Sequence, residues 1–145
     1  MRYMMLVKAS KASEAGVMPT AEQIGEMGKY NEQLVNAGVI LDGAGLHPSS
    51  QGFRVHYSGD KKTIVDGPFA ETKELIAGYW LLQVASREEA LEWARRCPNP
   101  HFGEDTYVEV RRVFDISDFP EESFSTPDAA AARELEIAHR AKTGR

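Results

Sequence analysis

The chain has 145 residues, of which 42% are hydrophobic and 27% are charged. This is the size and composition of one folded domain with a real core, so a disordered chain is excluded. Lys and Arg total 17 against 22 Asp and Glu, and the resulting net charge of −5 at neutral pH disfavours direct contact with nucleic acid.

The sequence also indicates where the protein resides. No stretch approaches the roughly 20 apolar residues of a membrane span, and the apolar run at the N-terminus is too short for a signal peptide. A single cysteine, Cys97, excludes an intrachain disulfide bond and fits a reducing compartment. We therefore expect a soluble, cytoplasmic protein that is neither secreted nor inserted into a membrane.

The first forty residues predict a strand, a loop and a helix. Residues 3–7 are apolar and few, which is typical of a buried strand. Residues 9–19 show no periodic pattern and predict a loop. Thr20 and Gln23 then form a capping-box pattern at the start of a helix, and Gly38 is a natural end for it.

The rest of the chain up to residue 115 alternates in a similar way. Extended stretches are expected at residues 39–46, 75–85 and 107–113, and a hairpin at residues 53–57 and 62–65. A second helix begins with a capping-box pattern at Ser86 and ends before Pro98. The resulting order is the ferredoxin-like βαββαβ plan, an α+β fold, with an extra hairpin inserted between its two halves.

Such a sheet carries both helices on one face, so its other face needs a partner. Trp80, Leu82 and Val84 or their neighbours would make that face apolar, and a second copy of the chain is the simplest cover for it. We expect a homodimer, and a monomeric mass in solution would contradict this.

The C-terminal residues have a different composition. We expect residues 1–115 to form the α+β domain and residues 116–145 to form an appended loop and helix. Thr126 and Pro127 mark the start of that helix, and its apolar stripe is mostly alanine.

One string of the sequence resembles a known family. The string is Val65-Asp66-Gly67-Pro68-Phe69-Ala70-Glu71-Thr72-Lys73-Glu74, followed by Gly78-Tyr79, and it resembles the signature of the DGPF, or YCII-related, family. Further pieces agree in order and spacing over about residues 1–115: Tyr3-Met4, Ala37-Gly38-Val39, Gly45-Leu46-His47-Pro48, Glu89-Ala90-Leu91-Glu92-Trp93-Ala94, Arg96-Cys97-Pro98 and Val108-Glu109-Val110-Arg111.

The resemblance implies a dimeric α/β barrel of ferredoxin-like subunits. It implies little about chemistry, because the DGPF branch has no settled activity and a fold does not transfer function. Relatives in the wider YCII-like group have been proposed as enzymes because they carry a His-Asp pair in a cleft. Some DGPF proteins are similar to partners of extracytoplasmic-function sigma factors, which implies a regulatory alternative.

His47 and Asp66 are the candidate catalytic residues. His47 follows a predicted strand at a position where clefts tend to open, and its near-neutral pKa in free solution suits proton transfer. Asp42 or Asp66 could fix its tautomer. The alternatives are a solvated surface histidine and, for Asp66, a turn former before Gly-Pro whose carboxylate caps nearby backbone N–H groups.

Other residues are candidates for ligand binding. Arg54 could anchor an anionic ligand, Glu71 and Lys73 could pair at the mouth of a cleft, and Phe69 and Tyr79 could form its walls. The alternative for the charged residues is a solvated face. The sequence contains no metal-ligand spacing, phosphate loop or dinucleotide fingerprint, so neither a metal nor a cofactor is predicted.

Two classes of function follow. The first is a small-molecule-binding protein or a cofactor-independent enzyme that uses His47 and Asp66, with Arg54, Glu71, Lys73 and Tyr79 around the ligand. The second is a non-enzymatic accessory protein that contacts a transcription regulator. The sequence alone does not decide whether the chain is an enzyme.

Overall fold

In the computed structural model, which describes residues 1–144, the chain forms two compact units, the first of residues 1–112 and the second beginning at Val113. The first unit contains, in chain order, β1 (Arg2–Lys8), α1 (Lys11–Glu14), α2 (Ala21–Asn36), β2 (Ile40–Gly45), β3 (Phe53–Ser58), β4 (Lys61–Asp66), β5 (Ile76–Gln83), α3 (Arg87–Arg96) and β6 (Val108–Arg112). The helix α4 (Pro127–Thr143) belongs to the second unit.

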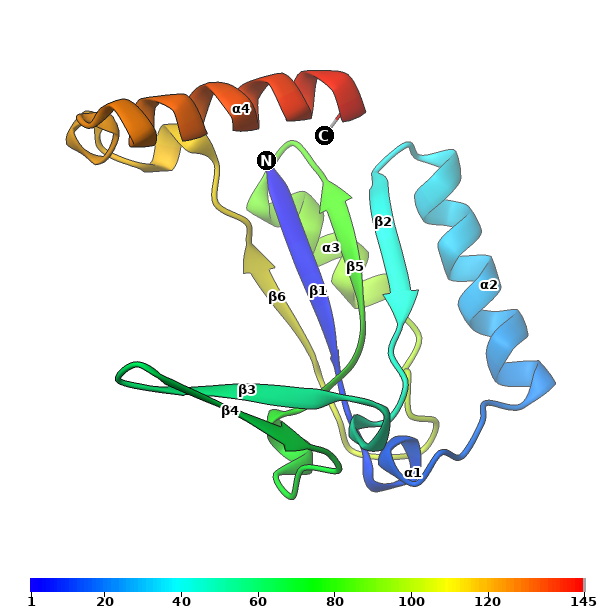
Figure 1. Cartoon of the computed structure of the whole chain (residues 1–145). Coiled ribbons are helices and arrows are strands. Elements are labelled where there is room, and N and C mark those ends of the chain that lie inside the picture. Colours follow the sequence, from blue (N-terminus) through cyan, green and yellow to red (C-terminus); the bar gives the residue numbers. More distant parts are fainter. Residues whose placement is uncertain (145) are drawn as a thin grey trace. The chain divides into compact units, whose positions relative to one another are not determined.

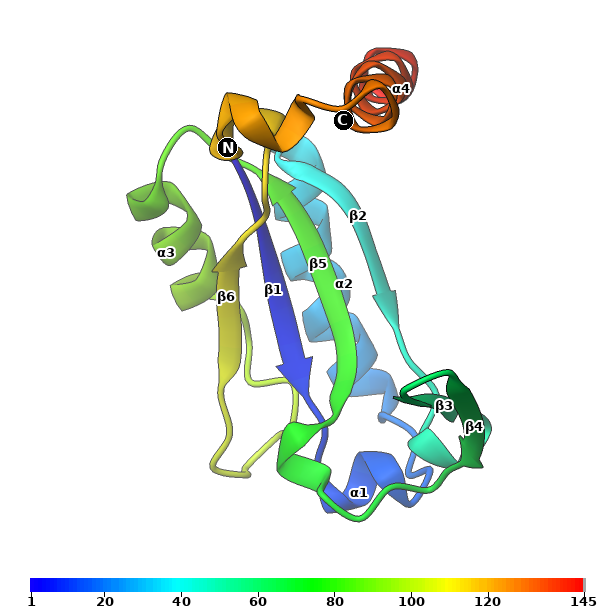
Figure 2. The ribbon, with the colours of Figure 1, turned by 60° about the vertical axis from the view of Figure 1, so that its left-hand side comes forward.

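The four-stranded sheet of the first unit is antiparallel and has the order β2-β5-β1-β6. The two βαβ halves of a βαββαβ chain give this order when both helices pack on the same face of the sheet. Figures 1 and 2 show α2 and α3 together on one face. The α+β, ferredoxin-like fold with an inserted hairpin is therefore confirmed.

The core lies between this sheet and the two helices. Met5, Leu34 and Leu82 have no exposed surface, and they come from β1, α2 and β5. The hydroxyl of Tyr30 on α2 donates a hydrogen bond of 2.7 Å to the carbonyl oxygen of Trp93 on α3, so a polar contact joins the two helices inside the core. Burial raises the pKa of the Tyr30 phenol well above its usual range, and the group stays protonated as a donor.

The helix caps are mostly those that the sequence predicts. Thr20 and Gln23 exchange side-chain to backbone hydrogen bonds of 2.9 and 3.2 Å, which completes a capping box at the start of α2. Ser86 caps α3 by accepting from the N–H of Glu89. The second capping box is wrong in one bond, because the Glu89 carboxylate accepts from the N–H of Ala85 rather than from that of Ser86.

The residues between β1 and α2 are not the structureless loop that the sequence predicts. Ser10 and Ser13 form a capping box, and residues Lys11–Glu14 make one helical turn, α1. This turn was missed because four residues are too few to show a helical period. Figure 1 shows α1 at the end of the sheet where the hairpin lies.

The face of the sheet opposite α2 and α3 carries half-buried side chains, most of them apolar. Trp80, Leu82 and Val84 point toward the helices and are buried, so it is their neighbours that form the open face. The strand register places Met4, Leu6, Tyr79 and Leu81 together there, at the middle of the sheet.

The hairpin of β3 and β4 is a separate two-stranded sheet, and all its residues are exposed. Cross-strand pairing divides the side chains between two faces. One face is mainly apolar and carries Phe53, Val55, Tyr57 and Ile64, with the charged residues Asp66 and Lys62 paired opposite Phe53 and Tyr57. The other face carries Arg54 and His56.

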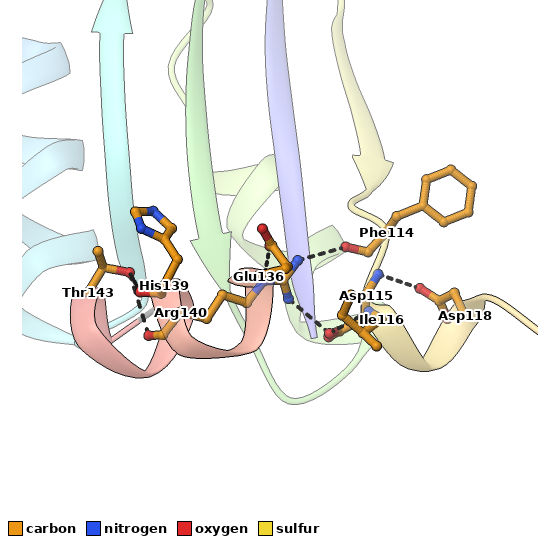
Figure 3. Close-up of polar contacts among 8 residues, drawn as sticks. All are labelled: Phe114, Asp115, Ile116, Asp118, Glu136, His139, Arg140 and Thr143. Atoms are coloured by element: carbon orange, nitrogen blue, oxygen red, sulfur yellow. Dashed lines mark hydrogen bonds and ion pairs between the residues drawn. The ribbon is translucent and has the colours of Figure 1, made fainter. Parts of the chain in front are cut away.

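The second unit is held together by ion pairs of Arg140 and Arg133 and by a group of aromatic rings, and Figure 3 shows the contacts of Arg140. Arg140 on α4 binds the carboxylate of Asp115 at 2.8 Å and that of Glu136 at 2.6 Å. The rings of Phe114, Phe119 and Phe124 stack in series with centroid distances of 5.2 and 6.2 Å. These contacts tie α4 to the segment that precedes it. No helix in residues 1–144 is long and apolar enough to cross a membrane.

We predict that Leu34→Ala lowers the free energy of unfolding of the first unit by about 2–5 kcal/mol, because it leaves a cavity in the core. Its neighbour on α2, Val35, is the matched control: 60% of Val35 is exposed, against 0% of Leu34, and Val35→Ala should change stability by about 0.5 kcal/mol or less. Urea titration followed by tryptophan fluorescence measures both, since Trp80 and Trp93 lie in this unit. Equal midpoints for the two variants would contradict the described core.

Candidate functional site

A cavity of about 310 Å³ lies at the end of the sheet where β2 leads into the hairpin and β5 begins. Its walls come from three stretches of the chain: Glu14, residues 46–54 and residues 69–76. The lining residues are Glu14, Leu46, His47, Pro48, Ser49, Gln51, Gly52, Arg54, Phe69, Leu75 and Ile76. Ligand pockets of about this size are typically apolar with a few polar groups, and this cavity has that character.

Ser49 joins three of these segments by hydrogen bonds. Its N–H donates to Oε2 of Glu14 at 2.8 Å, and its hydroxyl donates to Oε1 of the same carboxylate in a very short bond. The Ser49 Oγ in turn accepts from the N–H of Phe69 at 3.0 Å. The bonds of Ser49 therefore link α1, the turn after β2 and the segment after β4.

The Asp66-Gly67-Pro68-Phe69 segment packs directly on the Ser49 turn. The N–H of Gly67 donates to the carbonyl oxygen of Gly52 at 2.9 Å, and the Gly67–Pro68 peptide bond is cis. A Cβ atom at position 67 would lie 1.8 Å from the carbonyl oxygen of Ser49. Only glycine fits here, because any side chain would collide with backbone atoms that cannot rotate away.

Arg54 lies over the ring of Phe69, with 3.8 Å between the guanidinium carbon and the ring centroid. The pair crosses from the hairpin to the segment after β4 and forms one side of the cavity. Within residues 1–144 the guanidinium has no carboxylate partner. A guanidinium that stacks by its face keeps its edge N–H groups available for acceptors.

The structure places the two predicted catalytic residues differently. His47 lines the cavity, and its ring makes no hydrogen bond within the described part of the chain. Asp66 ends β4 opposite Phe53 and is exposed, outside the cavity lining. No hydrogen bond joins His47 to Asp66 among residues 1–144, so the predicted pairing of these two side chains stays a prediction.

The predicted ligand-binding residues also divide into two groups. Arg54 and Phe69 line the cavity, as expected of a binding residue and a wall. Glu71 and Lys73 lie in and beside the 3-10 turn Thr72–Glu74 and are exposed, outside the lining. Tyr79 lies on the open face of the sheet, where its hydroxyl donates to Oδ2 of Asp42 at 3.2 Å, so it is not a wall of this cavity.

Glu14 and Ser49 are site residues that sequence reasoning missed. Glu14 was hidden because its segment was predicted as a loop, and its carboxylate meets Ser49 across 35 positions of the chain. The Ser10 and Ser13 pattern ahead of Glu14 was the available signal, since it resembles a short helix start. For Ser49 the only signal was its place directly after His47-Pro48.

A second cavity of about 260 Å³ lies beside the end of α3, where Cys97 and Tyr107 are among the lining residues. Burial raises the pKa of the Cys97 thiol to about 11, so this cysteine is a protonated thiol at neutral pH. No three His, Cys, Asp or Glu side chains within residues 1–144 are grouped as metal ligands would be.

Comparison with known proteins supplies the family. The YCII-related domain matches residues 1–117, which is most of the chain. The chain belongs to this family. A relative in Rhizobium meliloti (strain 1021), the "uncharacterized protein R00369", is 35% identical over 86 residues, which are 59% of this chain and 68% of the relative.

A solved structure with some similarity is the 5-chloro-2-hydroxyhydroquinone dehydrochlorinase (TftG) of Burkholderia phenoliruptrix AC1100, in complex with 2,5-dihydroxybenzoquinone. It is 13% identical with a TM-score of 0.46, and the match covers 83% of this chain and 100% of that one. A similarity of this size carries no information on the chemistry of the YCII-related chain described here.

We predict that Gly67→Ala disrupts the Ser49 turn, because the new Cβ collides with a carbonyl oxygen, and that it costs about 1–3 kcal/mol or more of stability. Gly52→Ala is the matched control, since a Cβ there would have its nearest neighbour at an ordinary 3.7 Å. Thermal melts measure stability, and amide NMR shifts at Phe69 report the turn. Melting temperatures within one degree or so of each other would contradict the close approach at Gly67.

Proposed function

We propose that this YCII-related chain binds a small organic molecule in the cavity lined by His47 and Arg54, as a cofactor-independent enzyme or a ligand-binding protein. The cavity itself carries the proposal. It combines apolar walls from Leu46, Leu75 and Ile76 with the free polar groups of His47 and Arg54. Convergence of a few polar groups in an apolar pocket is the usual form of a small-molecule site.

The catalytic version of the proposal is a proton transfer at His47. An imidazole can take or give a proton near neutral pH, and His47 has ring nitrogens that no other group within residues 1–144 engages. The carboxylate nearest in the lining is Glu14, and both of its oxygens accept from Ser49. Asp66 would orient His47 only after a rearrangement on ligand binding, as catalytic hydrogen bonds in ligand-free sites are often incomplete.

A second candidate function is that of an accessory protein of a transcription regulator, and one observation favours it. The apolar face of the hairpin exposes 64% of Phe53, 68% of Tyr57 and 66% of Ile64. Exposed apolar patches of this kind often mark contacts with other proteins. A transcription regulator bound to the hairpin would fit this second function, which needs no role for His47.

We expect the protein to act as a homodimer in the cytoplasm. The open face of the sheet supports the dimer, because Met4, Leu6 and Leu81 lie side by side there and neither α2 nor α3 covers them. The single cysteine, protonated at neutral pH, supports a reducing compartment.

For the dimer we predict a solution mass of twice 16.1 kDa by light scattering. Leu81→Glu on the open face should reduce the mass to that of a monomer, since it places a charge in the interface. Leu91→Glu on α3, where the leucine is 42% exposed, should leave the dimer intact. A monomeric wild-type protein would contradict the dimer.

The binding proposal is tested by a thermal-shift screen of a small-metabolite library on wild type and on His47→Ala. We expect at least one compound to raise the melting temperature of wild type and to lose most of that effect in His47→Ala, because the imidazole lines the cavity. His56→Ala is the matched control, since His56 is an exposed histidine on β3 outside the lining.

The alternative outcomes separate the two functions. A compound that stabilises wild type, His47→Ala and His56→Ala equally would bind elsewhere and would contradict the proposed site. If no compound in the library stabilises wild type, the regulatory function becomes the better candidate. Capture of a regulator that is abolished by Tyr57→Ser in the hairpin would then support that function.

A further inference from the structure

We infer that the ligand of the cavity is a small monocarboxylate with an apolar body about the size of one ring, and that the edge of the Arg54 guanidinium receives its carboxylate. This inference rests on the proposed function, because it names the chemical class of molecule that the same cavity takes. It follows from an account of which polar groups in the cavity are already bonded and which are free.

Several backbone N–H groups of the turns around the cavity are bonded within the protein. The N–H groups of Gln51 and Gly52 donate to the carbonyl oxygens of Pro48 and Ser49 at 2.9 and 3.0 Å, and the carbonyl oxygen of Gly52 accepts from Gly67. The N–H of Phe69 is bonded to Ser49 Oγ. A phosphate or sulfate, which usually needs several converging backbone N–H groups, would therefore find those donors already occupied.

The acidic group of the cavity is also engaged. The Glu14 carboxylate accepts two hydrogen bonds from Ser49, one from its N–H and one from its hydroxyl. Ser49 has no remaining donor, because its only N–H and its only O–H both go to Glu14. Ser49 thus has no donor left for a ligand. Hydrogen bonds from neutral donors do not remove the charge of the Glu14 carboxylate, so recognition of an anion falls to the side chains of the lining other than Glu14.

Three polar side chains of the lining remain without a hydrogen bond within residues 1–144: His47, Gln51 and Arg54. Arg54 has donors only, and His47 is a donor on at least one nitrogen. A ligand that supplies acceptors and a negative charge complements this set, whereas an ammonium ligand would face the guanidinium with like charge. The free groups therefore favour an anion over a cation.

The geometry of Arg54 favours a planar carboxylate. The Phe69 ring covers one face of the guanidinium at 3.8 Å, which restricts its side chain and leaves its edge N–H groups for a ligand. Two parallel N–H groups at such an edge match the two oxygens of a carboxylate. This stacked, pre-oriented cation distinguishes the site from a solvated arginine on a strand.

The apolar lining and the volume set the size of the ligand body. Leu46, Leu75 and Ile76 offer no hydrogen-bonding side chain, so the part of the ligand that contacts them is apolar. A cavity of about 310 Å³ holds on the order of ten atoms of the size of a water molecule. One carboxylate attached to one six-membered ring has this size.

The experiment compares benzoate, the neutral benzamide and the cationic benzylamine by amide NMR titration of the full chain. We expect benzoate to shift the signals of Ser49, Gly52 and Phe69 and to bind about tenfold or more tightly than benzamide, since it makes charge-assisted hydrogen bonds. Arg54→Gln should weaken benzoate binding about tenfold or more and leave benzamide unchanged. Arg54→Lys, which keeps the charge and loses the edge geometry, should lie between wild type and Arg54→Gln.

The matched control is Lys62→Gln. Lys62 is the other cation of the hairpin that lies over an aromatic ring, 5.9 Å from the centroid of Tyr57, and it does not line the cavity. Its loss removes the same charge from the same hairpin, so benzoate affinity should change less than about twofold. Preserved NMR dispersion in Arg54→Gln shows that the hairpin is still folded.

Three results would overturn the inference. Equal affinity of benzoate and benzamide for wild type would show that the carboxylate is not recognised. Unchanged benzoate affinity in Arg54→Gln would show that Arg54 does not bind it. If benzamide or benzylamine shifts the cavity signals in a His47-dependent way while benzoate does not, the proposed function stands and the anionic ligand is wrong. If no probe shifts these signals and no metabolite raises the melting temperature, both the proposed function and the monocarboxylate ligand are wrong.

Discussion

The hydrogen bonds of Ser49 are the interaction on which the arrangement of the cavity depends. Both of its donors go to the Glu14 carboxylate, and its oxygen accepts from the backbone of Phe69. Three segments that contribute little to the main core meet at this one side chain. Hydrogen bonds to a charged carboxylate are stronger than those between neutral groups, so a single small residue can hold the segments together. The close approach of Gly67 is the steric counterpart of the same contact.

The architecture of the first unit could be predicted from the sequence because each of its elements carries a local pattern. The caps at Thr20 and Ser86, the short apolar run of β1 and the apolar-polar alternation of β6 depend on neighbours within a few residues. The prediction failed at α1, where one turn of helix is too short to show a period. The orientation of β5 was left open, because this strand carries large apolar residues on both faces and so shows no apolar-polar alternation.

The candidate site was less predictable than the fold. His47, Arg54 and Phe69 were chosen because they stand beside strand ends or within a recognisable string, and all three line the cavity. Glu14 could not be named, since its importance comes from a contact with Ser49 at a distance of 35 positions in the chain. Tyr79, predicted as a wall, lies three residues beyond the lining residue Ile76 on β5, and its hydroxyl contacts Asp42.

The exposed hairpin makes the affinity of the site depend on a folding equilibrium. Arg54 is carried by β3, and two strands without a third are marginally stable by themselves in water. A ligand held by Arg54 therefore selects chains whose hairpin is closed, and its apparent affinity is reduced by the fraction that is open. Substitutions on the apolar face, far from any ligand atom, would tune binding through this fraction. In this way the stability of the hairpin would set the apparent affinity for the ligand, through residues that never touch the bound molecule.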